Sequence, residues 1–182
     1  MTNAIGTKEE RLTRIGGSEF ASVLDKNPYK KRIDLILEKA GVIANTFEGN
    51  EMTARGNRLE HEVISRFENE TGILVNNRQG EFTLSPDNCL PLVCHVDGIT
   101  SNEAVFEAKT TDVRGKVWKD GIPEYYKLQL EFNMMLSGLT GSYITVGICN
   151  GDEIIGHQTY AYTKQMTDAE IIKACVMFSK EV

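Results

Sequence analysis

Three ionisable side chains, those of Asp97, Glu107 and Lys109, interrupt two apolar stretches in the middle of the chain. Asp97 precedes a glycine at the end of one stretch, and a short turn leads to the stretch that contains Glu107 and Lys109. If the two stretches are paired strands, both carboxylates stand at strand ends and meet at one sheet edge. Carboxylates this close repel each other unless one is protonated or a cation lies between them. Oxygen ligands select a hard cation, Mg²⁺ or Mn²⁺.

Lys109 lies two residues beyond Glu107, so the alternation of a strand places both side chains on the same face. An ammonium at this position can orient a water molecule and offset the charge that builds on a phosphate during hydrolysis. The pattern Asp…Glu-x-Lys therefore indicates cleavage of phosphodiesters. A Glu-x-Lys triplet is also common on exposed strands without a catalytic role, so support from other parts of the sequence is needed.

Two further polar residues lie on the apolar faces of predicted helices. Glu60 belongs to a helix over residues 53–71 and precedes two apolar residues by three and four positions, which turns it toward the buried stripe. Gln129 belongs to a helix over residues 123–137 and lies on its apolar face, where an unpaired amide is costly. Both side chains need polar partners, and Glu60 is a candidate third carboxylate.

The remaining elements are predicted from hydrophobic periodicity and turn residues. Ser18 is a candidate N-cap for a helix over residues 18–26, which Pro28 ends. The other predicted elements are a helix over 30–41, strands over 80–84, 91–99, 103–109, 142–149 and 154–162, and a closing helix from Thr167. This order predicts a single α/β domain over residues 1–182, with a central mixed sheet flanked by helices.

The composition is that of a globular protein, since 41% of the 182 residues are hydrophobic and 25% are charged. No apolar run approaches the roughly 20 residues that cross a bilayer, and the N-terminus lacks the order of a signal peptide. We therefore expect a cytoplasmic protein without a membrane partner. The net charge of −6 argues against a protein that coats nucleic acid nonspecifically, but it is compatible with a DNA enzyme whose acidic residues surround a cation.

The four cysteines, Cys89, Cys94, Cys149 and Cys175, include no Cys-x-x-Cys pair, so the sequence offers no local scaffold for zinc. Their scattered spacing favours reduced thiols that are mostly buried. An iron–sulfur cluster, which some nucleases carry, draws on the same number of cysteines and is the alternative.

Four segments carry a family pattern: RIGGSEFASVLDKNPYK, ARGNRLEHEVISRFENETG, the pair VDGIT and VFEAKTT, and VWKDGIPEYYKLQLEFNMMLSG. Together they resemble the lambda-exonuclease and YqaJ-like viral recombinase family of the PD-(D/E)xK nuclease superfamily. The resemblance extends from about Arg11 to Gly147, and the combination is specific although each segment alone is moderately so. It implies a restriction-endonuclease-like core in a single exonuclease domain.

The resemblance also implies roles for individual residues. The catalytic set that it implies is Glu60, Asp97, Glu107, Lys109 and Gln129. Within this set, Asp97, Glu107 and Glu60 would bind Mg²⁺ or Mn²⁺, together with the backbone carbonyl of Ala108.

Arg11, Ser18 and His95 are candidates for contacts with DNA or its 5′-phosphate. Similar exonucleases place an arginine at the position of Arg11, and Ser18 follows on a turn whose backbone amides favour an anion. The alternative is that Arg11 is a solvated charge in a basic run, with Arg14 as an equal candidate. His95 can touch a phosphate or surround the metal site, or it is simply hydrogen-bonded near the sheet edge.

The resemblance implies a Mg²⁺-dependent deoxyribonuclease, a 5′-to-3′ exonuclease on linear double-stranded DNA that acts in phage-type recombination. It further implies a ring-shaped trimer, a single-strand annealing protein as partner, and a bacterial or phage-infected host cell. A resolvase- or restriction-type endonuclease and a non-catalytic DNA-end-binding subunit are the alternatives. The family pattern often has a small Ser-Pro before its Asp-Gly and a second glutamine on the helix, whereas this chain has His95-Val96 and Glu131, which leaves the substrate preference open.

Overall fold

The larger of two β-sheets is mixed, as the order of elements predicts. The computed structural model describes residues 8–44 and 51–182, so the start of the N-terminal stretch lies outside the described part. In spatial order, the larger sheet contains β2 (Val75–Asn76), β5 (Gly98–Thr100), β6 (Val105–Asp112), β7 (Gly141–Asn150) and β8 (Glu153–Thr163). Within this larger sheet, only β6 and β7 are parallel, and the other neighbouring strands are antiparallel.

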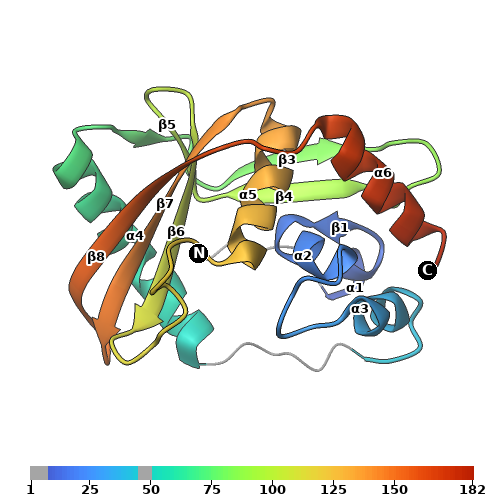
Figure 1. Ribbon diagram of the computed structural model, residues 1–182, viewed down its shortest axis with the longest axis horizontal. Helices are drawn as coiled ribbons and strands as arrows, with labels where there is room; N and C mark the ends of the chain where they lie inside the picture. Colours follow the sequence, from blue (N-terminus) through green and yellow to red (C-terminus); the bar gives the residue numbers. More distant parts are fainter. Residues whose placement is uncertain (1–7, 45–50) are drawn as a thin grey trace.

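A smaller sheet has three strands in the order β1 (Ile15–Gly16), β4 (Leu92–Val96) and β3 (Gly80–Leu84). Helix α5 (Glu124–Ser137) connects the parallel strands β6 and β7 and packs against both sheets. Figure 1 shows α5 at the place where the two sheets meet. Helix α5 therefore contacts strands of both sheets.

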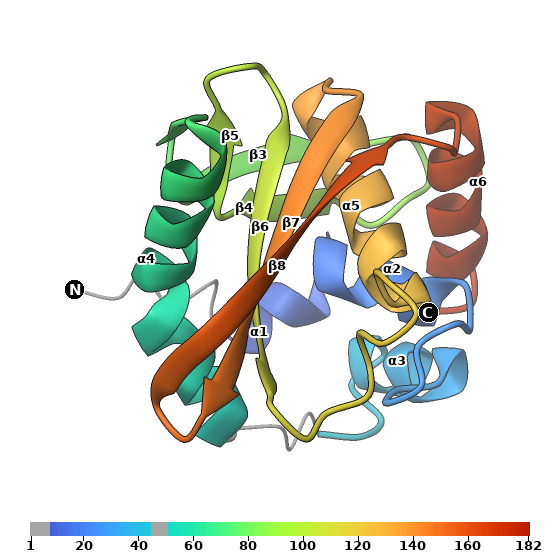
Figure 2. The ribbon, with the colours of Figure 1, turned by 60° about the vertical axis from the view of Figure 1, so that its left-hand side comes forward.

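The remaining helices cover the outer faces of this arrangement. Helix α4 (Glu51–Thr71) packs on the face of the larger sheet opposite α5, as Figure 2 shows. Gly72, with φ of 70°, ends α4 as predicted. The other helices are α1 (Lys8–Leu12), the 3₁₀ helix η1 (Gly17–Glu19), α2 (Phe20–Val23), α3 (Arg32–Lys39) and α6 (Asp168–Ser179). Among the described residues, none of the helices combines the length and the apolar character that crossing a bilayer requires.

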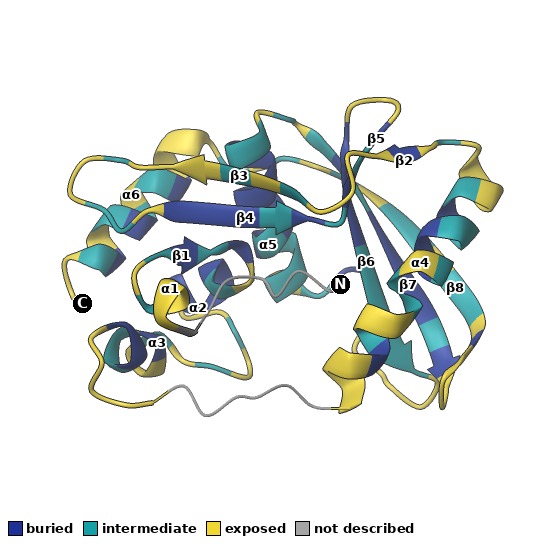
Figure 3. Cartoon of the chain, turned by 180° about the vertical axis from the view of Figure 1, so that it is seen from behind, coloured by how far each residue is buried: buried dark blue, intermediate teal, exposed yellow. Residues whose placement is uncertain are grey.

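The hydrophobic core has two main parts, one on each side of the larger sheet. The first lies around α5, α2, α6 and β4 and contains Phe20, Phe132 and Phe178, all fully buried. The second lies under α4, where the rings of Phe67 and Phe106 are 4.7 Å apart. Figure 3 shows the buried residues along β4 and on the inner faces of the helices.

The predicted strand over residues 91–99 is wrong as a single element. The chain leaves the smaller sheet after β4, turns at Asp97, and enters the larger sheet as β5. Both halves are apolar, so the sequence alone gives one continuous strand. The break exists because each half finds hydrogen-bonding partners in a different sheet, with β3 for β4 and β6 for β5.

The predicted helix over residues 18–26 is also shorter than expected, and Ser18 is not its N-cap. Ser18 lies inside η1, and the backbone N–H of Gly16 donates instead to the carboxylate of Glu19, at 2.9 Å. The helix ends at Val23, before a residue in the left-handed region, Asp25, with φ of 55°. The expected serine cap is thus absent, and neither η1 nor α2 has an N-cap side chain that accepts a hydrogen bond from its first turn.

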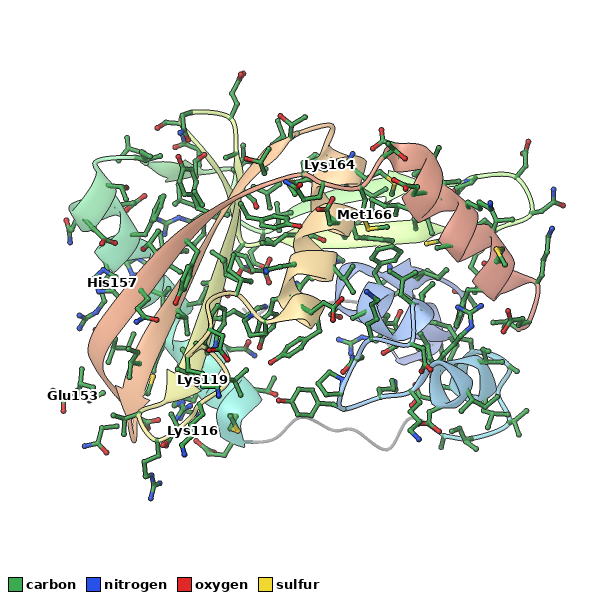
Figure 4. The ribbon with its side chains drawn as sticks, in the orientation of Figure 1. Lys116, Lys119, Glu153, His157, Lys164 and Met166 are labelled. Atoms are coloured by element: carbon green, nitrogen blue, oxygen red, sulfur yellow. The ribbon has the colours of Figure 1, made fainter. Side chains whose placement is uncertain are left out.

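Glu131 is a buried residue of α5 that anchors the chain between β8 and α6. Its side chain accepts hydrogen bonds from the Tyr162 hydroxyl at 2.7 Å and from the backbone N–H groups of Gln165 and Met166 at 2.7 and 3.1 Å. Met166 directly precedes Thr167, the N-cap of α6 (Figure 4). Since only 1% of Glu131 is exposed, these three donors depend on one carboxylate.

Glu131→Gln should lower the free energy of unfolding by about 1–3 kcal/mol, because an amide nitrogen would face at least one buried donor that then has no acceptor. Urea unfolding of the variant measures this change. The control is Glu153→Gln, which removes the charge of an exposed glutamate at the start of β8 and should leave the midpoint unchanged. Equal stability of both variants would contradict the anchoring role of Glu131.

Candidate active site

Asp97 occupies the turn where the chain crosses from the smaller to the larger sheet. Its Oδ2 accepts a hydrogen bond from the backbone N–H of Ala108 at 2.7 Å. This amide is accessible to Asp97 because β5 pairs with β6 only through Gly98 and Ile99, opposite Phe106 and Val105. Asp97 thus lies next to Glu107, at the edge of β6 that β5 leaves uncovered beyond Phe106.

Glu107 lies within β6 rather than at the strand end that the sequence predicts, because β6 continues to Asp112. Only 3% of the residue is exposed. Its Oε1 accepts hydrogen bonds from Gln129 Nε2, at 2.8 Å, and from Lys109 Nζ. Its Oε2 is buried without a hydrogen-bond partner, which is a costly state for a carboxylate oxygen.

The structure confirms the predicted alternation along β6. Val105 contributes to the core around α5, on the face that also carries Glu107 and Lys109, whereas Phe106 and Ala108 pack under α4. Gln129 reaches Glu107 from α5, which supplies the polar partner that its position on an apolar face requires. The structure thus brings Asp97, Glu107, Lys109 and Gln129 together.

The pKa of Asp97 is raised well above its ordinary value, first because the carboxyl is buried and second because Glu107 lies nearby. Lys109 and the N–H of Ala108 act in the opposite direction but do not offset these effects. Burial lowers the pKa of Lys109, but Glu107, Tyr126 and Asp97 raise it more, so the net pKa lies above its ordinary value. Lys109 is therefore an ammonium at neutral pH.

Glu60 approaches from α4, on the other face of the larger sheet. Its Oε1 accepts a hydrogen bond from Gln79 Nε2 at 2.7 Å, and its charge contributes to the raised pKa of Asp97. Within residues 8–44 and 51–182, no three His, Cys, Asp or Glu side chains are close enough together to hold a metal ion. Glu60 thus acts on Asp97 electrostatically, and its role as a metal ligand stays a prediction.

The donor set of this site fits a hard divalent cation. Asp97 and Glu107 offer carboxylate oxygens, and the Oε2 of Glu107 is buried without a partner. Ala108, which follows Glu107 in β6, offers its backbone carbonyl oxygen. All of these donors are oxygens, which Mg²⁺ and Mn²⁺ prefer over nitrogen or sulfur. A cation between the carboxylates would also relieve the repulsion that raises the pKa of Asp97.

His95 is paired within the smaller sheet. It lies opposite Glu81 in the register of β3 and β4, and its Nε2 is 2.7 Å from Glu81 Oε2. This contact corresponds to the simpler of the two interpretations, a histidine hydrogen-bonded near the sheet edge. A contact of His95 with DNA stays a prediction.

Arg11 and Ser18 lie in α1 and η1, and both are exposed. The sequence did not indicate what holds these two segments together, which is the buried ammonium of Lys39. Its Nζ donates to the backbone carbonyl of Arg11 at 2.6 Å and to both carboxylate oxygens of Glu19, at 2.7 and 2.9 Å. Gly17 makes η1 fit closely on α5, since a Cβ there would lie 2.3 Å from the Oδ1 of Asn133.

The four cysteines are free thiols, and Cys94, Cys149 and Cys175 are buried. Burial raises the pKa of Cys94 and of Cys175 to about 12, which keeps both protonated. Their positions agree with the interpretation as reduced, buried residues. In the part of the chain that the structure describes, they form no metal-binding group.

Sequence reasoning missed a contact between Lys109 and Tyr126. The ring centroid of Tyr126 is 5.1 Å from Lys109 Nζ, and the same ring stacks on Trp118 at a centroid distance of 5.3 Å. Trp118 is only 7% exposed, so it serves packing beside the site rather than base stacking. The available signal was the spacing of Tyr126 and Gln129, three residues apart on one helix face.

The model of one protein family, described as the YqaJ-like viral recombinase domain, matches residues 8–140 of the chain. YqaJ, an uncharacterised protein of Bacillus subtilis (strain 168), is 28% identical to the chain over an alignment of 178 residues; the match covers 95% of the chain and 52% of that protein. The chain thus spans about half the length of this relative.

Two solved structures share the fold over nearly the whole chain. An alkaline exonuclease of Laribacter hongkongensis has a TM-score of 0.73 at 20% identity, over 96% of this chain and 92% of that one. A phage-related exonuclease of Haemophilus somnus 129PT has a TM-score of 0.68 at 14% identity, over 97% of this chain and 96% of that one.

The mixed sheet flanked by helices is shared with these two exonuclease structures, which confirms the predicted fold class. The match over residues 8–140 identifies the family within this class. The chain belongs to the YqaJ-like viral recombinase domain family.

Asp97→Asn should stabilise the protein in metal-free buffer near neutral pH. The raised pKa of Asp97 means that ionisation favours the unfolded chain, so wild-type stability falls as the pH rises from about 4, the unfolded pKa, through the raised folded pKa. The asparagine keeps an acceptor for the Ala108 N–H but cannot ionise, so its advantage should vanish in acid. Thermal melting in EDTA at several pH values measures this difference.

Addition of Mg²⁺ extends the same experiment. At a concentration of about one hundred times its dissociation constant, the ion should stabilise the wild type by about 2.7 kcal/mol and Asp97→Asn by much less. The control is Asp120→Asn, at an exposed aspartate, which should respond to Mg²⁺ as the wild type does. A wild type whose melting temperature ignores Mg²⁺ would contradict the metal site.

Proposed function

We propose that the chain is a Mg²⁺-dependent deoxyribonuclease that degrades linear double-stranded DNA from its 5′ ends. The observation that carries the proposal is the buried, unpaired Oε2 of Glu107, next to Asp97 and beside the ammonium of Lys109. Among the carboxylate oxygens of the described residues, this is the one that is buried without a partner, and a bound cation would supply the partner that it lacks. The family membership and the fold shared with exonucleases support the same function.

A bound Mg²⁺ would polarise the scissile phosphate and make a bound water more acidic. The chain would hold it through Asp97, Glu107 and the carbonyl of Ala108, with Glu60 as a further acidic group. Gln129 donates to Glu107 and the N–H of Ala108 donates to Asp97, so each carboxylate is held in one orientation. This preorganisation avoids reorganisation of the ligands during each turnover.

Hydrolysis adds the oxygen of a water molecule to phosphorus and breaks one phosphodiester bond. Lys109 is a cationic donor that contacts the Glu107 carboxylate directly, and its raised pKa keeps it charged. Its N–H groups can orient the attacking water or bind a phosphate oxygen, where negative charge builds in the transition state. Lys109 is thus assigned the electrostatic role and the carboxylates the ligand role.

We further propose that this activity serves phage-type homologous recombination in the cytoplasm of a bacterium or phage-infected cell. The description of the family as viral recombinases supports this role. Digestion from 5′ ends would expose a 3′ strand for a single-strand annealing protein. A ring-shaped trimer around the duplex, implied by the resemblance, would keep the enzyme on its substrate.

The test compares end-labelled linear DNA with closed circular DNA, in Mg²⁺ and in EDTA. The proposal expects mononucleotides from linear DNA only, and only with Mg²⁺. Nicked circles would indicate an endonuclease of the same superfamily instead. Binding of ends without any cleavage would indicate a non-catalytic subunit.

Lys109→Ala should still fold and bind DNA, but it should cut at least about a hundredfold more slowly, which is the scale for loss of one electrostatic stabiliser. Lys109→Arg should not restore the rate, because a planar guanidinium does not replace a compact ammonium. The control is Lys173→Ala on α6, an exposed lysine that should leave the rate unchanged. Full activity of Lys109→Arg would point to a general surface charge.

A 5′-end exonuclease benefits from recognition of the terminal phosphate, and Arg11 with Ser18 is the candidate pair. Hydrogen bonds to charged groups contribute about 1.5–3 kcal/mol, so a 5′-phosphate should speed digestion at least about tenfold over a 5′-hydroxyl. Arg11→Ala should erase this preference and keep slow cutting. Arg14→Ala is the matched variant, because Arg14 is the competing arginine and lies 3.9 Å from Glu10. A preference lost only in Arg14→Ala would move the assignment to that residue.

A further inference from the structure

We propose that Tyr126 positions Lys109 by presenting its ring face to the ammonium, and that Trp118 keeps this ring in place. The inference rests on the proposed nuclease function, since it assigns a supporting residue to the lysine of that site. Lys109 Nζ lies 5.1 Å from the centroid of the Tyr126 ring. An ammonium within about 6 Å of an aromatic centroid is attracted by the negative face of the ring.

Lys109 needs this second contact because its carboxylate partner is shared. The Oε1 of Glu107 accepts hydrogen bonds from both Lys109 and Gln129, and the other oxygen of the same carboxylate is the proposed ligand. A cation that draws charge from Glu107 weakens the hold of this carboxylate on the ammonium. The neutral ring of Tyr126 continues to attract Lys109 in that state.

The ring also leaves the donors of Lys109 available. It attracts the positive charge as a whole, whereas a carboxylate or carbonyl would bind one N–H in a fixed direction. An ammonium has three N–H donors, of which one is directed to Glu107. The others remain for a water molecule or a phosphate oxygen, which is what the proposed role requires.

A stack of aromatic rings holds Tyr126 in this position. Trp118 lies against Tyr126 with an interplanar angle of 22° and against Tyr160 of β8 with an angle of 21°. Trp118 is a buried residue of a largely exposed loop between β6 and α5, which also carries Lys116 and Lys119 (Figure 4). The stack thus joins the loop, α5 and β8 behind the lysine.

Helix α5 supports both charged members of the β6 motif in the same way. Gln129 contacts Glu107, and Tyr126, three residues earlier on the same helix face, contacts Lys109. The spacing of these two helix residues corresponds to the Glu-x-Lys spacing on β6. Tyr126 is therefore a positioning residue, matched to Lys109 as Gln129 is matched to Glu107.

The activity test compares Tyr126→Leu with Tyr126→Phe. Tyr126→Leu should lower kcat about tenfold, or about 1.4 kcal/mol, with KM for DNA within about twofold of the wild type. Tyr126→Phe keeps the ring face and should stay within about twofold in both constants. The matched control is Tyr143→Leu, which removes a half-buried tyrosine that packs on Phe67 under α4 and should leave kcat unchanged. A Leu variant with wild-type kcat, or a Phe variant as slow as the Leu variant, would overturn the proposal.

A second measurement tests the contact itself and does not depend on nuclease activity or on the folding of Tyr126→Leu. A ring facing an ammonium shifts the ε-methylene protons of that lysine upfield in the NMR spectrum. In wild-type protein with labelled lysine, the signal that Lys109→Arg removes should show this shift, and Tyr126→Phe should retain it. An ordinary chemical shift for Lys109 would overturn the proposal, even if the protein is a nuclease. A shifted signal in a protein without nuclease activity would contradict the proposed function but keep the contact.

Discussion

Burial of Glu107, with the half-buried Asp97 beside it, is the constraint on which the rest of the structure depends. Removing carboxylates from water costs several kcal/mol for each group unless partners replace the lost hydration. The partners here are the N–H of Ala108, the amide of Gln129 and the ammonium of Lys109. They come from β6 and α5, so the acidic pair is stable only when the sheet, the helix and the crossing turn are in place together.

The topology explains how these groups meet. The parallel strands β6 and β7 require a long crossover, and α5 is that crossover, so it packs on the face of β6 that carries Glu107. The chain between β4 and β5 changes from one sheet to the other at Asp97, beside a stretch of β6 that the short β5 does not cover. The same turn that ends the smaller sheet therefore delivers a carboxylate to an open edge of the larger one.

Local periodicity was sufficient for the parts of the structure that depend on neighbouring residues. The alternation along β6, the stop of α4 at Gly72 and the need of Gln129 for a polar partner all follow from spacing and residue type. The Asp-Gly and Glu-x-Lys pattern predicted that Asp97 and Glu107 lie close together, because two strands joined by a short turn leave few other arrangements.

Contacts between segments far apart in the chain could not be predicted in this way. Lys39 reaches Glu19 across 20 positions, and Glu131 accepts donors from a segment more than 30 residues later. Each of these side chains is charged and has no distinctive neighbours in sequence, so an exposed position was the natural expectation. Their burial depends on partners that only the tertiary fold supplies, as does the ring of Tyr126 under Lys109.

The negative charge of Asp97 and Glu107 is only partly balanced by nearby positive charge, and the proposed chemistry depends on this excess. With both carboxylates ionised, Lys109 balances only one of them, and Glu60 adds further negative charge from the other face of the sheet. The excess is tolerated because stability comes from the two apolar cores on either side of β6 rather than from the site itself. One oxygen of Glu107 is left without a donor, and this is the position that the proposed divalent cation would occupy.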